Sequence, residues 1–237
     1  MNSIYLLSKF TLKSEIKLLL YGILHFILNI LLFPKRSMYV AAIRGFLLSP
    51  IIKGPLRVRF IMGNVILNDI SKIFLDTDAI IKEGVHVKKG LELGRRSYIE
   101  RGTTINGPVV IGSRCFVNYG TEINGETSIG DNVIVGPGVK FLSKTHEKGS
   151  EDFRAGNLHH LPIKVEKGVW IGGGVIILGG VTIGRGSIVG AGSVVTKNVP
   201  ENAVAVGNPA KVIKRLGPGY GGKPKGSPKK PPETKWA

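Results

Sequence analysis

Large apolar residues recur at every sixth position along most of the chain. The series starts at Leu75, runs without interruption to Phe141, and resumes from Val165 to Val195. A small or β-branched residue mostly stands two positions before each member, and glycine often follows it. The members are Leu75, Ile81, Val87, Leu93, Ile99, Ile105, Ile111, Val117, Ile123, Ile129, Val135, Phe141, Val165, Ile171, Ile177, Ile183, Val189 and Val195.

A period of six excludes an α-helix, because 3.6 residues per turn would spread these side chains around the helix axis. The period is typical of a repeated short strand that ends in a sharp corner, where glycine supplies the unusual backbone dihedrals. Three such units close one triangular coil, and stacked coils bury the large residues in a continuous interior. Eighteen units predict about six coils of an all-β solenoid, a parallel β-helix over residues 75–200.

The pattern stops between Phe141 and Val165, where the sequence becomes polar and charged. Residues 142–163 are therefore expected to leave the solenoid as an excursion loop, and a loop of this length is typically functional. The less regular residues 37–74 are expected to cap the first coil. Residues 201–216 predict a turn and a short C-terminal helix.

The last segment, residues 217–237, is rich in glycine, proline and lysine. Such a segment cannot pack a core, so we expect a disordered basic tail. It holds five lysines against one acid, which accounts for part of the formal net charge of +17. A basic excess favours acidic partners such as anionic lipids or phosphorylated small molecules. Because the tail offers only Tyr220 and Trp236 as aromatic residues, specific nucleic-acid binding is not expected.

The N-terminal segment is apolar from Leu18 to Phe33, with lysine or arginine on both sides. This stretch is shorter than the ~20 residues that span a bilayer as a helix. Residues 1–36 are therefore expected to form a helix that lies on the inner face of the cytoplasmic membrane, with its cations on lipid phosphates. A buried packing helix or a subunit-contact helix is the alternative. A cytoplasmic protein, placed at that membrane face, is the localisation that this segment predicts.

Cys115 is the single cysteine, which excludes an intrachain disulfide and any metal site built from a cysteine cluster. Its place in the repeat, two positions before Val117, predicts a small core residue rather than a nucleophile. The chain has no Walker motif, no HExxH and no paired carboxylates that flank a cleft signal. The consecutive histidines His159 and His160 point in different directions, so no metal site is predicted.

His146 is the leading catalytic candidate. It lies in the excursion, just after the last regular strand, so a rigid scaffold holds it while it projects from that scaffold. An imidazole that titrates near neutrality is suited to take a proton from a hydroxyl as the hydroxyl attacks a thioester. An acid that orients the ring is also expected, and the sequence leaves three candidates open: Glu147, Glu151 and Asp152.

Residues from about Tyr98 to Leu216 resemble the hexapeptide-repeat acyltransferases, in their galactoside and maltose acetyltransferase branch. The motifs that carry the resemblance are Phe116-Val117-Asn118-Tyr119, IGDNVIVGPGVKFLSKTH, and PIKVEKGVWIGGGVIILGGVTIGRGSIVGAGSVVTKNVPENAVAVGNPAKVIKR. The resemblance implies coils that wind left-handed, acetyl-CoA as co-substrate without a metal, and a homotrimer with active sites between adjacent subunits.

The resemblance also implies roles for individual residues. His146 matches the general base, Asn118 matches the asparagine that holds the acceptor, and Trp170 matches the tryptophan beside the pantetheine channel. The positions that match coenzyme A contacts are Gly173, Ala191, Thr196, Lys197, Lys211 and Lys214. At the last two the relatives carry arginines, so the charge is kept while bidentate geometry is lost. The alternatives are a turn-stabilising asparagine, a packing tryptophan and a solvated basic helix.

Two departures bear on the acceptor. The N-terminal acceptor-binding residues of the sugar acetyltransferases have no clear match, and the segment between Ile123 and Ile129 is too short to carry their acidic contact. The expected function is therefore O-acetylation of a saccharide hydroxyl near the membrane, in surface polysaccharide or glycolipid biosynthesis. The alternatives are a xenobiotic (antibiotic) or amino-sugar N-acetyltransferase, a non-catalytic β-helix scaffold, and a metalloenzyme of the same fold resembling carbonic anhydrase.

Overall fold

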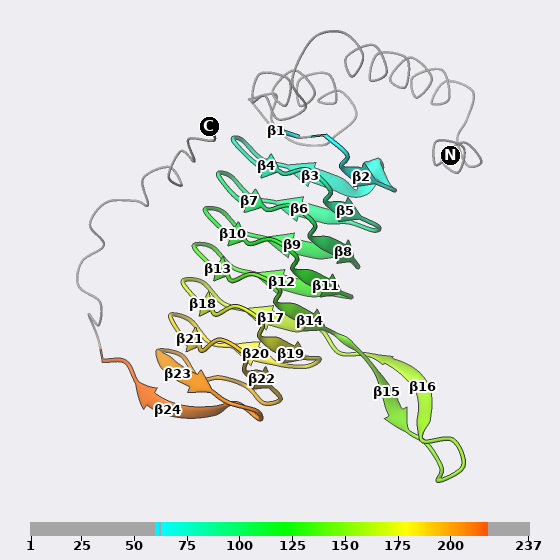
Figure 1. Cartoon of the computed structure of the whole chain (residues 1–237), viewed down its shortest axis with the longest axis vertical. Coiled ribbons are helices and arrows are strands. Elements are labelled where there is room, and N and C mark those ends of the chain that lie inside the picture. Colours follow the sequence, from blue (N-terminus) through cyan, green and yellow to red (C-terminus); the bar gives the residue numbers. More distant parts are fainter. Residues whose placement is uncertain (1–59, 62, 218–237) are drawn as a thin grey trace, which may run out of the picture.

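The chain winds into a β-solenoid whose strands form three sheets, and a two-stranded arm projects from one side (Figure 1). The computed structural model describes residues 60–61 and 63–217. Three parallel sheets form the sides of the solenoid, and the arm is a separate antiparallel sheet. Within the described ranges no helix is long and apolar enough to cross a membrane. The helix expected over residues 1–36 lies outside these ranges, as does the expected tail after Gly217.

The strands are short and follow one another from sheet to sheet. Sheet 1 contains β1 (Phe60–Ile61), β4 (Ile80–Ile81), β7 (Tyr98–Ile99), β10 (Phe116–Val117), β13 (Ile134–Val135), β18 (Trp170–Ile171), β21 (Ile188–Val189), β23 (Ala203–Val206) and β24 (Lys211–Arg215). Sheet 2 contains β2 (Ile66–Leu67), β5 (His86–Val87), β8 (Thr104–Asn106), β11 (Glu122–Asn124), β14 (Lys140–Leu142), β19 (Ile176–Leu178) and β22 (Val194–Val195). Sheet 3 contains β3 (Ile73–Leu75), β6 (Leu91–Leu93), β9 (Val109–Ile111), β12 (Thr127–Ile129), β17 (Ile163–Val165) and β20 (Thr182–Ile183). The arm consists of β15 (Lys144–Lys148) and β16 (Ala155–His160), and a 3₁₀ turn spans Ile70–Lys72.

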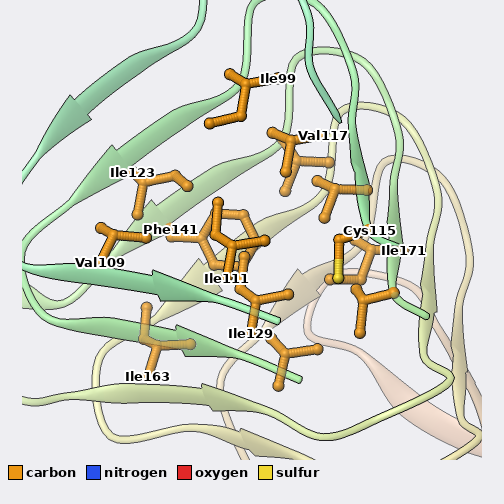
Figure 2. Packing of buried hydrophobic residues seen from close by; sticks show 14 of the residues in the cluster. Ile99, Val109, Ile111, Cys115, Val117, Ile123, Ile129, Phe141, Ile163 and Ile171 are labelled. Atoms are coloured by element: carbon orange, nitrogen blue, oxygen red, sulfur yellow. The ribbon is translucent and has the colours of Figure 1, made fainter. Parts of the chain in front are cut away.

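The six-residue period places its apolar members on the inner side of every sheet. No residue of the series exposes more than 2% of its surface. Val117, Ile123 and Ile171 point into the shared interior, and Cys115 points there with them (Figure 2). The predicted core and the predicted parallel β-helix are therefore confirmed, whereas left-handed winding stays a prediction from the resemblance.

The solenoid is longer than the predicted six coils, because sheet 1 alone has eight parallel strands. The first coil consists of β1, β2 and β3, so all of it except Leu75 lies in the segment that we expected to be a cap. Ile61 pairs with Ile81, twenty residues later, whereas Ile73 pairs with Leu91, eighteen residues later. The extra residues, at the 3₁₀ turn, shift the first coil out of the six-residue frame and hide it from the periodicity.

The predicted C-terminal helix is wrong. Residues 203–206 form β23, with Ala203 and Ala205 buried against the core, and β24 returns antiparallel to it. The last strand of a solenoid sheet leaves a row of backbone donors and acceptors without a partner, and an added strand pairs with them where a helix would not. β-branched residues in KVIKR suit that strand.

Candidate active site

Two corners of the coil have the same backbone conformation and different chemistry. Corner 1–2 joins sheet 1 to sheet 2, and includes residues 82–84, 100–102, 118–120, 136–138, 172–174 and 190–192. Corner 3–1 joins sheet 3 to sheet 1, and includes residues 76–78, 94–96, 112–114, 130–132, 166–168 and 184–186. The third residue of every one of these segments has a positive φ, between 55° and 73°: Gly84, Gly102, Gly120, Gly138, Gly174, Gly192, Asp78, Arg96, Arg114, Asn132, Gly168 and Gly186.

A hollow lies along corner 1–2 on the outer side of sheet 1. It brings together four of the residues predicted for the site: Asn118, Trp170, Gly173 and Ala191. The other residues that line it are Ile134, Gly136, Pro137, Gly172, Ile188, Val189 and Gly190. The glycine that often follows an apolar residue of the repeat was the sequence signal for three of them, Gly136, Gly172 and Gly190.

The glycines of the hollow leave the corner backbone bare. A Cβ on Gly136 would lie 2.5 Å from the Gly173 nitrogen, and one on Gly172 would lie 2.5 Å from the Ala191 nitrogen. Adjacent coils therefore approach too closely here for a side chain. A ligand on this edge meets peptide groups directly.

The backbone N–H group of the second residue in each corner 1–2 segment is bonded, missing or free, depending on the coil. Tyr119 N–H donates to Asn118 Oδ1 at 2.8 Å, and Pro137 has no N–H to donate. In the next two coils, the N–H groups of Gly173 and Ala191 form no hydrogen bond within the described part of the chain. Two donors therefore stand free in adjacent coils, about 4.8 Å apart, the usual spacing between neighbouring strands.

The tryptophan of the hollow is not a packing residue of the core. Trp170 exposes 55% of its surface on the outer face of sheet 1, and its strand neighbours in register are Ile134 and Ile188. These three side chains make one wall of the hollow apolar, opposite the bare backbone of corner 1–2. The apolar wall and the bare backbone together suit a ligand that has both an apolar surface and amide groups.

Asn118 stabilises its own turn and also offers a donor to the hollow. Its Oδ1 accepts the Tyr119 N–H, which assigns the amide orientation and leaves Nδ2 to donate elsewhere. Its backbone carbonyl accepts a hydrogen bond from Thr121 Oγ1 at 2.8 Å. The turn-stabilising role and the binding role expected for Asn118 are thus compatible.

His146 lies on β15, exposed to solvent and paired with Leu158 of β16. Its Nδ1 is 2.8 Å from the carbonyl oxygen of Gly156. A carbonyl only accepts, so Nδ1 carries the proton of the neutral ring and Nε2 presents a lone pair. A backbone carbonyl therefore orients the ring, and no sequence signal marked Gly156. Of the three acids considered for that role, Glu147 lies instead 3.7 Å from His159 Nδ1.

One chain does not bring His146 to the hollow. The arm leaves the solenoid between β14 of sheet 2 and β17 of sheet 3 and projects away from it (Figure 1). The hollow lies on the corner between sheets 1 and 2, and none of its lining residues belongs to the arm. The histidine and the hollow are thus two separate parts of the candidate site.

The remaining residues predicted for coenzyme A lie outside the hollow. Thr196 and Lys197 are exposed just after β22, and Lys211 and Lys214 are exposed on β24. β24 pairs with β23, the last parallel strand of sheet 1. All four therefore lie near the C-terminal end of the solenoid, Thr196 and Lys197 in the last coil that lines the hollow, and Lys211 and Lys214 on the strand that follows β23.

Cys115 takes no part in the site. Its side chain is buried, and Sγ is 3.0 Å from the carbonyl oxygen of Gly130. Burial raises the pKa of this thiol to about 11, so it stays neutral near pH 7. The prediction of a core residue is confirmed. Among the described residues no three His, Cys, Asp or Glu side chains are grouped to hold a metal ion.

Comparison with known proteins places the repeats in a described sequence family. The family model "Bacterial transferase hexapeptide (six repeats)" matches residues 162–197. A protein of Schizosaccharomyces pombe, named as a candidate acetyltransferase, is 44% identical over 80 residues, which cover 34% of this chain and 39% of that protein. The chain thus matches about two fifths of the length of this curated relative.

Solved structures show further likeness. A hexapeptide-repeat acetyltransferase of Vibrio cholerae, complexed with acetyl coenzyme A, is 33% identical, with 53% of this chain and 70% of that chain covered and a TM-score of 0.49. A mutant N-acyltransferase of Bacillus cereus, in complex with dTDP-4-amino-4,6-dideoxyglucose and coenzyme A, is 19% identical, with 76% and 90% covered and a TM-score of 0.52. The second likeness is one of fold.

Proposed function

The chain belongs to the hexapeptide-repeat transferases, and on that premise we propose that it transfers an acetyl group from acetyl-CoA to a saccharide hydroxyl. One observation carries the proposal. Corner 1–2 offers two free peptide N–H groups opposite an exposed tryptophan, while a separate arm presents a histidine whose Nε2 is free to accept a proton.

The hollow fits the pantetheine arm of acetyl-CoA. That arm carries two amide carbonyls, and the N–H groups of Gly173 and Ala191 are donors that such carbonyls accept. Its aliphatic segments would pack on Trp170 and its isoleucine neighbours. At the end of the solenoid, Lys211 and Lys214 with Thr196 and Lys197 would hold the anionic nucleotide end.

The proposed reaction is direct transfer within a ternary complex. His146 Nε2 removes the proton of the acceptor hydroxyl while that oxygen attacks the thioester carbonyl carbon. The new C–O bond forms, the C–S bond breaks, and the imidazolium returns its proton to the departing sulfur. Asn118 Nδ2 would hold the acceptor beside the base. No acyl-enzyme is required, which agrees with the buried, neutral thiol of Cys115.

A second copy of the chain would complete each site, since His146 and the hollow lie on different corners. If sheet 3 of one copy faces sheet 1 of the next, the arm of the first copy lies beside corner 1–2 of the second. The outer face of sheet 1 suits burial, because its residues in register are apolar or aromatic. They are Ile80, Tyr98, Phe116, Ile134, Trp170, Ile188 and Val204. Three such contacts close a homotrimer.

A mixture of two inactive variants tests the shared site. His146→Ala removes the base and keeps the hollow, whereas Asn118→Ala damages the hollow and keeps the base. Co-expressed with different tags and purified as mixed oligomers, the two variants should regain activity, because one interface then pairs an intact base with an intact hollow. Mixed oligomers as inactive as each parent would contradict the shared site.

Thiol release from acetyl-CoA with a panel of monosaccharides tests the base. We expect His146→Ala to lower kcat by about 10²- to 10⁴-fold. His159→Ala, on the other strand of the arm, serves as the control and should stay near the wild-type rate. Wild-type turnover by His146→Ala would contradict the assignment. Mass spectrometry of the product separates an O-acetyl ester, which hydroxylamine removes, from the N-acetyl amide of an amino-sugar acetyltransferase.

The acceptor's setting is part of the same proposal. The apolar, basic segment over residues 1–36 favours contact with the inner face of the cytoplasmic membrane, where a lipid-linked saccharide or glycolipid would be the acceptor. The full chain should then cosediment with anionic vesicles and less with neutral ones. Equal absence from both pellets would remove the basis for a membrane-bound acceptor.

A further inference from the structure

The hollow ends at Asn118, but corner 1–2 continues beyond it with larger side chains. In the coils that line the hollow, the first two corner residues are Gly136 and Pro137, Gly172 and Gly173, and Gly190 and Ala191. One coil toward the N-terminus they are Asn118 and Tyr119, and one coil further they are Glu100 and Arg101. The edge therefore changes abruptly from bare backbone to functional side chains at Asn118.

The register between coils places these side chains above one another. Ile99 pairs with Val117, and Glu100 N–H donates to the Val117 carbonyl at 2.8 Å, so Glu100 and Asn118 take the same place in adjacent coils. Gly120 N–H donates to the Arg101 carbonyl at 3.1 Å, which places Arg101 above Tyr119. Adjacent coils are about 4.8 Å apart, a separation comparable to that between hydroxyls on opposite edges of a sugar ring.

These side chains are available to a ligand. The side chains of Glu100 and Arg101 enter none of the hydrogen bonds or ion pairs formed within residues 63–217. Tyr119 exposes 55% of its surface at the corner. On the outer face of sheet 1 beside them, the rings of Tyr98 and Phe116 form a tilted pair with centroids 6.3 Å apart.

We propose that Glu100, Arg101 and Tyr119 form the acceptor subsite, which binds a polyhydroxylated ring one coil beyond Asn118. This assignment rests on the proposed acetyl transfer, because it extends the same site along the same corner. The acyl donor would occupy the bare part of the edge, the acceptor the functionalised part, and the reacting atoms would meet at Asn118.

The chemistry of these three side chains and of Asn118 selects this class of acceptor. Asn118 Nδ2 and the Arg101 guanidinium only donate, whereas the Glu100 carboxylate only accepts. A hydroxyl does both, so a ring with several hydroxyls satisfies donors and acceptors on one edge. The exposed face of Tyr119 adds a flat apolar surface for the C–H side of such a ring. A simple apolar amine would pair with the carboxylate but leave the guanidinium without an acceptor.

Kinetics with the best monosaccharide of the panel tests the subsite. Glu100→Gln should raise the KM for that sugar about tenfold or more, with the KM for acetyl-CoA unchanged. Tyr119→Ala should do the same, while Tyr119→Phe, which keeps the flat ring, should raise the KM for the sugar less than Tyr119→Ala does. Glu83→Gln provides the matched control, since this acid stands on the same corner one coil beyond Arg101 and should have no effect.

A binding measurement separates failure of the subsite from failure of the reaction. Saturation-transfer NMR with the methyl glycoside of that sugar reads binding without catalysis, and His146→Ala should bind like wild type. An unchanged sugar KM and an unchanged NMR signal in both Glu100→Gln and Tyr119→Ala, each folded by circular dichroism, would overturn the subsite while acetyl transfer stands. Wild-type protein that releases no thiol with any acceptor would instead overturn the proposed function.

Discussion

Corner 1–2 and corner 3–1 share a backbone conformation but differ in whether carboxylates accept their peptide N–H groups. At corner 3–1, three of the second-position N–H groups donate to neighbouring carboxylates. The Ser113 N–H donates to Asp131 at 2.7 Å and the Arg185 N–H to Glu166 at 3.0 Å. The Thr77 N–H donates to the adjacent Asp76. At corner 1–2 no carboxylate accepts such a bond in the described chain, and the N–H groups of Gly173 and Ala191 stay free.

The difference shows how one repeated turn can leave its peptide donor bonded or free. Where a carboxylate accepts the second-position N–H, as at Ser113 and Arg185, that donor is not available to a ligand. Where the corner is lined by glycine and alanine, as at Gly173 and Ala191, the donor is free. At Ser113 and Arg185 the bond depends on one acidic side chain in the adjacent coil, so we expect that substitution can add or remove it.

The largest effect on stability is expected at the bare glycines of corner 1–2. Gly172→Ala places a Cβ 2.5 Å from the Ala191 nitrogen, so adjacent coils must separate, and we expect the free energy of unfolding to fall by about 3 kcal/mol. Gly192→Ala meets nothing within 4 Å and bears only the strain of a positive φ, about 1 kcal/mol. Chemical denaturation of both variants measures the gap, and equal losses would refute the close-approach argument.

A carboxylate transplanted from one corner to the other should close the donor site. Ala191 stands to Gly173 as Asp131 stands to Ser113, eighteen residues later. In Ala191→Asp the new carboxylate should accept the Gly173 N–H, and the KM for acetyl-CoA should rise about 10- to 100-fold without loss of stability. Ala191→Asn tests the hydrogen bond without the charge, because its neutral side-chain oxygen can still accept the Gly173 N–H.

The reciprocal variant is the control for that transplant. Asp131→Ala removes the cap on Ser113 and should lower the free energy of unfolding by about 1 kcal/mol, with the KM for acetyl-CoA unchanged. If Ala191→Asp binds acetyl-CoA as well as wild type does, the free N–H of Gly173 is not part of the donor site.

A smaller effect, on stability alone, is expected at an unpaired polar group that lies in the core rather than at the ligand-facing corner. The Thr127 hydroxyl is buried in the core and has no hydrogen-bond partner among the described residues. Thr127→Val keeps the shape and removes the buried polar group, so thermal or chemical denaturation should show a gain of about 1 kcal/mol. Thr121→Val, which removes a hydroxyl bonded to the Asn118 carbonyl at 2.8 Å, should show a loss instead.

The periodicity was sufficient to predict the core because the inner side of a β-helix is a purely local consequence of the six-residue unit. Every residue of the series is buried. Where the frame shifted, at the 3₁₀ turn before Ile73, the same reasoning missed a coil. At the C-terminus the pairing of β24 with β23 depends on a neighbour that local propensity does not include, so a strand was mistaken for a helix.

The site was less predictable than the core for a related reason. Motifs identified Asn118, Trp170, Gly173 and Ala191, and the structure brings these four together. Motifs do not reveal which backbone amides are already bonded, because that depends on the adjacent coil. Nor did they indicate that a Gly156 carbonyl would fix the imidazole, since any residue has a carbonyl.

The arm enters the solenoid without disturbing its register. Val117 pairs with Val135 eighteen residues on, and Val135 pairs with Ile171 thirty-six residues on, yet both are neighbouring coils of one sheet. An insertion confined to one corner therefore changes no stacking contact above or below it. In such a framework the arm that carries His146 can be lengthened, shortened or exchanged, while the hollow along corner 1–2 keeps its stacking.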